Sequence, residues 1–164
     1  MAWIFSLSAE CGSKKEDAER FCKHFKKVTL KLYTGIESKC EAETFQDEED
    51  NWWGMITNAG LSNTGINTAE DAYQMTEIGI LLYQKLQSVT SFRYALVGVE
   101  VDYFRTYSEL IENPHILNIY FPGLVLSFEL WEMIGRPVGF QFFSTGYVWK
   151  PYQGEIYKPL EHLG

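Results

Sequence analysis

The pattern of apolar and polar residues predicts two helices in the first hundred positions, and the first of them shows apolar residues at helical spacing. This set stands at i, i+3, i+4 and i+7, the spacing of one face of an amphipathic helix: Ala18, Phe21, Cys22 and Phe25. Ser13 and Glu16 precede this set in a capping-box pattern, which predicts that a helix begins there. Thr68 and Asp71 form a second start of the same kind, and that helix is predicted to run to about Ser88.

Polar and apolar side chains alternate in other stretches, which is typical of half-buried strands. An apolar stretch at 92–101 predicts a strand that is covered on both faces and is therefore central in a sheet. The predicted strands are 2–7, 28–33, 37–44, 52–58 and 92–101.

The predicted order is strand, helix, strand, strand, strand, helix, strand. It favours an α+β fold with a mixed or antiparallel sheet and two helices packed on one face. The arrangement expected is a ferredoxin-like plait with one added strand.

The C-terminal third differs from this regular core. It holds 14 of the 26 aromatic residues but few periodic segments. We expect one domain over 1–164, with a βαβββαβ core at 1–101 and an irregular, aromatic-rich extension at 102–164 packed on it. Within the extension, 140–143 and 147–152 are predicted to pair as a hairpin.

Composition narrows the class of protein. The formal net charge of −8 disfavours a nucleic-acid partner, because an acidic field repels phosphate. The three cysteines lack any C-x-x-C spacing, which indicates reduced thiols. No secretory signal and no stretch of about 20 apolar residues is found, so we expect a cytoplasmic protein without a membrane partner.

The acidic residues are concentrated in one region. Nine acids and no base lie between positions 41 and 84, beside two tryptophans. Aromatic residues next to charge are typical anchors of protein interfaces. The predicted partner-binding residues are Asp47, Glu48, Glu49, Asp50, Trp52 and Trp53. They favour a non-catalytic interaction module, such as an immunity-type inhibitor of a basic protein; self-association through exposed aromatics is the other partner considered.

A second candidate site follows the predicted central strand. Glu100 and Asp102 could share a proton or hold a cation, and Arg105 could bind a carboxylate or phosphate. With His115 and Trp149 they would serve a small-ligand-binding protein or a carboxylate-dependent enzyme whose pocket lies between core and extension. The competing interpretation is structural: Asp102 caps a helix and Arg105 neutralises Glu100.

Motifs for the common enzyme classes are missing from the sequence. The three histidines are far apart and have no second ligand at metal-binding spacing. G-x-S-x-G, G-x-G-x-x-G and P-loop patterns do not occur. The sequence therefore predicts no metal and no cofactor, and it favours binding over catalysis.

Overall fold

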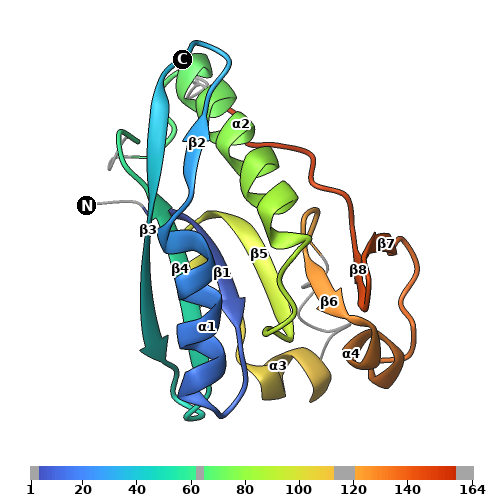
Figure 1. Cartoon of the computed structure of the whole chain (residues 1–164). Coiled ribbons are helices and arrows are strands. Elements are labelled where there is room, and N and C mark those ends of the chain that lie inside the picture. Colours follow the sequence, from blue (N-terminus) through green and yellow to red (C-terminus); the bar gives the residue numbers. More distant parts are fainter. Residues whose placement is uncertain (1–3, 62–64, 113–120, 158–164) are drawn as a thin grey trace, which may run out of the picture.

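One eight-stranded sheet runs through the molecule (Figure 1). The computed structural model describes residues 4–61, 65–112 and 121–157. The strand order is β2-β3-β4-β1-β5-β6-β8-β7, and every neighbouring pair is antiparallel. The strands are β1 (Phe5–Glu10), β2 (Thr29–Lys31), β3 (Glu37–Gln46), β4 (Trp52–Asn58), β5 (Tyr94–Val99), β6 (Val125–Ser127), β7 (Gln141–Ser144) and β8 (Tyr147–Trp149).

Helices pack on both faces of this sheet. The helical elements are α1 (Lys15–Lys26), α2 (Ala69–Leu86), η1 (Val101–Tyr103, a 3₁₀ turn), α3 (Tyr107–Glu112) and α4 (Phe128–Met133). Phe21 of α1 and Leu82 of α2 share one apolar cluster with Leu7 of β1. Leu110 of α3 and Leu130 of α4 belong to a second cluster on the opposite face. The core therefore has two layers, one on each side of the sheet.

The two long helices begin differently. Thr68 and Asp71 form the predicted capping box of α2, in which the Thr68 hydroxyl accepts from the Asp71 N–H at 3.0 Å. The box predicted at Ser13 and Glu16 does not form. Lys14 is the N-cap residue of α1, and no side chain accepts a hydrogen bond there.

β1 lies at the centre of the sheet and is buried along its whole length. Its odd positions, Phe5, Leu7 and Ala9, face α1 and α2. Its even positions carry polar side chains that are equally buried: Ser6, Ser8 and Glu10. The α3 face of the sheet therefore has polar side chains at its centre.

The α+β class and the antiparallel sheet are confirmed. The ferredoxin-like plait with one added strand is not confirmed, because eight strands exceed it and helices lie on both faces. The extension contributes β6, β7 and β8 to the same sheet, next to β5. The predicted hairpin in the extension is present as β7 and β8.

Candidate functional site

A pocket of about 360 Å³ opens on the α3 face of the sheet, where the end of β3 meets the segment after β5. We call it the acidic pocket. Four of its lining residues are acidic and three are aromatic. Its lining residues are Phe45, Gln46, Asp47, Glu48, Trp53, Asp102, Phe104, Arg105, Thr106 and Glu109.

The aromatic residues that line the acidic pocket form its aromatic wall, and they belong to the apolar cluster on the α3 face of the sheet. Trp53 stacks on Phe45 with ring centroids 5.8 Å apart and meets the edge of Tyr94 at 5.5 Å. Only 3% of Trp53 is exposed, and Tyr94 is fully buried. The Tyr94 hydroxyl donates to the Arg105 carbonyl at 2.5 Å, which fixes the chain on the far side of the pocket.

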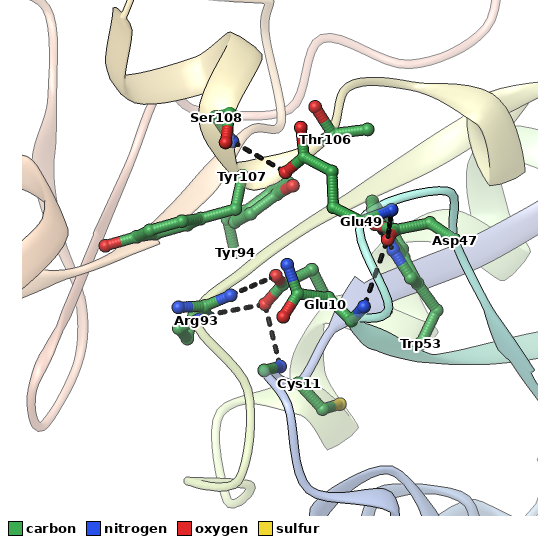
Figure 2. Close-up of polar contacts among 12 residues, drawn as sticks. Glu10, Cys11, Asp47, Glu49, Trp53, Arg93, Tyr94, Thr106, Tyr107 and Ser108 are labelled. Atoms are coloured by element: carbon green, nitrogen blue, oxygen red, sulfur yellow. Dashed lines mark hydrogen bonds and ion pairs between the residues drawn. The ribbon is translucent and has the colours of Figure 1, made fainter.

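Asp47 holds together the acidic loop, residues 47–50, which lies between β3 and β4. Its carboxylate accepts the N–H groups of Glu49 at 2.9 Å and Asn51 at 3.1 Å. It also accepts the indole N–H of Trp53 at 2.8 Å (Figure 2). One carboxylate therefore holds both the loop backbone and the aromatic wall, which fixes the position of its charge in the pocket.

Glu49 joins the same loop to α3. Its carboxylate accepts the Ser108 N–H at 3.1 Å (Figure 2). Desolvation acts to raise the pKa of Glu49, but hydrogen bonds with Ser108 and Thr106 outweigh it and hold that pKa below the ordinary 4.5. Glu48 and Asp50 are exposed, and Asp50 has the left-handed backbone of a turn, with φ of 65°.

A buried ion pair lies beside this loop, under α3. Glu10 has no exposed surface, and Arg93 contacts both of its carboxylate oxygens (Figure 2). The Gly12 N–H donates to the same carboxylate at 2.9 Å. The Arg93 guanidinium lies 3.7 Å from the centre of the Tyr107 ring, so it also supports α3. Burial raises the pKa of Glu10, while Arg93 acts in the opposite direction.

The residues predicted after the central strand do not form one cluster. Glu100 is exposed, with φ of 59°, and lies outside the acidic pocket. Asp102 and Arg105 line the pocket, so these two join the acidic loop there. His115 lies outside the described residues. Arg105 and Glu100 form no ion pair within the part of the chain that the structure describes, although the sequence suggested one.

Arg105 is the one basic residue among those that line the acidic pocket. Its Nη1 donates to the Phe104 carbonyl at 2.6 Å, and its guanidinium lies 5.9 Å from the Phe104 ring centre. Its Nε is buried and has no hydrogen-bond partner among the described residues. One cation faces four acids, so the pocket keeps a net negative charge.

The two predicted tryptophans point to different places. Trp53 belongs to the wall of the acidic pocket. Trp52 lies on the α1 side, half-buried, with the Lys15 ammonium 5.1 Å from its ring centre. Trp149 packs against Tyr83 at 5.1 Å between ring centres and does not line the acidic pocket.

Sequence reasoning missed Thr106 and Glu109, which line the acidic pocket. The Glu109 carboxylate accepts the Thr106 N–H at 3.1 Å, and the Glu109 N–H donates to the Thr106 hydroxyl at 3.3 Å. This is a capping box at the start of α3, and the pattern T-x-x-E could have revealed it. Glu10 was also missed, although its alternation with the apolar side of β1 was visible.

The chemistry of the acidic pocket suits a cationic group. Carboxylates supply acceptors and charge, and aromatic rings can contact a guanidinium or ammonium. No group of three or more His, Cys, Asp and Glu side chains that could hold a metal ion occurs among the described residues. Within the same residues, no helix is long and apolar enough to cross a bilayer.

Comparison of the chain with known proteins finds no significant match. No protein-family model matches the chain, and no curated protein or solved structure is significantly similar to it. The site must therefore be interpreted from its own geometry.

Proposed function

We propose that the protein is a non-catalytic interaction module that binds a basic protein partner through the acidic pocket. The observation that carries the proposal is the convergence of Asp47, Glu48, Asp102 and Glu109 on one pocket with an aromatic wall. A lysine or arginine side chain of the partner would enter the pocket and contact its carboxylates and rings. An immunity-type inhibitor of a cationic toxin is a protein of this physical type.

Preorganisation supports this proposal. Asp47 is fixed by three hydrogen bonds, and Glu49 ties the loop to α3. A charged surface that is already in place loses little conformational freedom on binding. Glu48 and Asp102 make no ion pair with any described residue, so their charges can act on a partner.

The test begins with partners captured by the immobilised protein from its native cells at low and at high salt. Association kinetics with a purified partner then compare wild type with the variant Glu48→Gln/Asp102→Asn. We expect the association rate at low salt to fall by about tenfold or more, and the difference to shrink as salt rises.

A matched control separates the pocket from net charge. Glu37→Gln/Glu70→Gln removes the same number of charges from exposed residues away from the pocket. It should slow association far less than the pocket variant. Equal effects of the two variants would mean that overall charge, not the acidic pocket, attracts the partner.

A second candidate function is a small-ligand-binding protein or a carboxylate-dependent enzyme. It is supported by the pocket's position between core and extension and by the Arg105 Nε, for which the described residues offer no hydrogen-bond partner. Titration calorimetry with succinate, a small dicarboxylate that can accept a hydrogen bond from Arg105, distinguishes the two, because a pocket for a basic side chain alone would not bind it. Micromolar binding that Arg105→Gln abolishes, without any protein partner, would favour this function over the first.

A further inference from the structure

The second half of β3 is an open edge of the sheet. β2 pairs only with the first residues of β3, from Glu37 to Lys39. β3 then continues beside α1 to Gln46, beyond the end of β2 (Figure 1). On that outer side no strand among the described residues pairs with positions 41–46.

The backbone N–H and C=O groups of β3 point either outward, to the open edge, or inward, to β4. The Cys40 N–H donates to Val28 at 3.0 Å and so points outward, whereas the Lys39 carbonyl accepts from Ala59 on the inner side. Backbone groups alternate along an antiparallel strand. The N–H and C=O groups of Ala42 and Thr44 therefore point outward, where another extended chain could pair with them.

A basic groove accompanies the open edge. A cavity of about 750 Å³ lies between α1 and the middle of β3. Its basic side chains outnumber its two acids, Glu19 and Glu43, although the whole chain carries a net charge of −8. These basic residues are Lys15, Arg20, Lys23 and Lys26.

The basic side chains of this groove differ in the contacts that they make. Arg20 pairs with Asp17 at 3.0 Å, and Lys15 lies over Trp52. Lys23 and Lys26 have no ion pair within the described part of the chain. Both project from α1 beside the edge.

We propose that the β3 edge binds an extended acidic segment of another protein by strand addition. The backbone of that segment would pair with Ala42 and Thr44. Since side chains alternate along a strand, every second one would face α1, where Lys23 and Lys26 meet carboxylates. This site lies on the α1 side of the sheet, opposite the acidic pocket, so it stands independently of the function proposed above.

A peptide fits this edge better than a nucleic acid does. Glu19 and Glu43 line the groove together with the basic residues, so a polyphosphate would meet carboxylates as well as lysines. A peptide strand instead uses the backbone groups of the edge, which a phosphodiester chain cannot pair in register.

The test measures binding of a fluorescent short peptide that alternates glutamate and threonine. Thr44→Pro removes an outward N–H and is the kind of change that edge strands tolerate. We expect this variant to weaken binding at least tenfold, whereas Thr44→Val, which keeps the N–H, should bind like wild type. Lys23→Glu/Lys26→Glu should also weaken binding at least tenfold without changing any backbone group.

Several results would overturn the proposal. One is equal binding of a peptide in which lysine replaces glutamate, and another is unchanged binding by both the proline and the lysine variants. Tighter binding of a single-stranded oligonucleotide, unaffected by Thr44→Pro, would indicate a general polyanion surface. A dimer in sedimentation that Thr44→Pro dissociates would assign the edge to a second copy of this chain. Circular dichroism shows whether each variant is folded, and the lysine variant keeps the test valid if the proline variant is not.

Discussion

Glu10 is a fully buried carboxylate that has one cationic partner, Arg93, among the described residues. Removing one member of a buried ion pair leaves an uncompensated charge. We therefore expect Arg93→Met to lower the free energy of unfolding by about 3 kcal/mol, the lower end of the usual range, because Arg93 is itself partly exposed. Urea denaturation measures this loss.

The stability lost in Arg93→Met should depend on pH, because the unpaired carboxylate of Glu10 can take up a proton. Without Arg93 the pKa of Glu10 in the folded state is raised further above its unfolded value. Such a group stabilises the fold below the unfolded pKa and loses that contribution as pH rises through the folded pKa. Arg93→Met should therefore recover stability on acidification, and Glu10→Gln/Arg93→Met should be less pH-dependent. If Arg93→Met were as stable as wild type at neutral pH, the ion pair between Glu10 and Arg93 would not be needed for the stability of the fold.

The sequence contains a sign of Glu10 but not of its partner. Alternation along β1 places Glu10 with Ser6 and Ser8, which marks a polar side of the strand. Arg93 follows 83 residues later, and it meets Glu10 because β1 and β5 pair in one particular register. A register between distant strands depends on the packing of the whole sheet, so local pattern could not predict it.

At the scale of elements, the two long helices allow a matched test of capping. Thr68 caps α2 with its hydroxyl, whereas the cap of α1 involves no side chain. Thr68→Ala should lower the free energy of unfolding by about 1 kcal/mol. Ser13→Ala should change it by less than about 0.5 kcal/mol. Thermal or urea denaturation of both variants checks the pair, and equal losses would contradict the capping geometry.

Long periodic elements were predicted well from the sequence. The strand predicted at 52–58 coincides with β4, and the second predicted helix is α2. β6 was not predicted, because the stretch that leads into it, 124–126, is apolar throughout and shows no alternation. It is stabilised by its neighbours β5 and β8 instead. Tertiary context, not local propensity, decides such short strands.

Only the parts of the acidic pocket were predicted, not the pocket itself. The acidic loop and the residues after β5 were expected as two separate sites. Asp47, Glu48 and Trp53 meet Asp102 and Arg105 in one pocket because the chain turns at Glu100 and passes back over the sheet. That turn depends on a left-handed residue for which the sequence, with Glu at the position, gives no signal.

At the scale of the whole molecule, core and extension are joined by buried contacts. Leu124, Val125 and Leu126 have no exposed surface. The Tyr83 hydroxyl donates to the Gly123 carbonyl at 2.8 Å and accepts the Val97 N–H at 3.0 Å, so α2, β5 and the extension share one group.

We therefore expect the whole sheet to unfold in one cooperative step. Denaturant-dependent hydrogen exchange should give amides of β5 and of β8 the same free energy of global opening. Opening of β8 amides at a clearly lower free energy would instead indicate that the extension unfolds by itself.

The pairing of β1 with β5 also has a consequence for synthesis on the ribosome. Glu10 pairs with Tyr94, which is made 84 residues later. At about 5–20 residues per second, β1 waits roughly 4–17 s for this partner. A strand that were wholly apolar would be prone to aggregate during this delay. The two serines and the glutamate of β1 interrupt its apolar character, which would keep the nascent segment hydrated until the centre of the sheet can close.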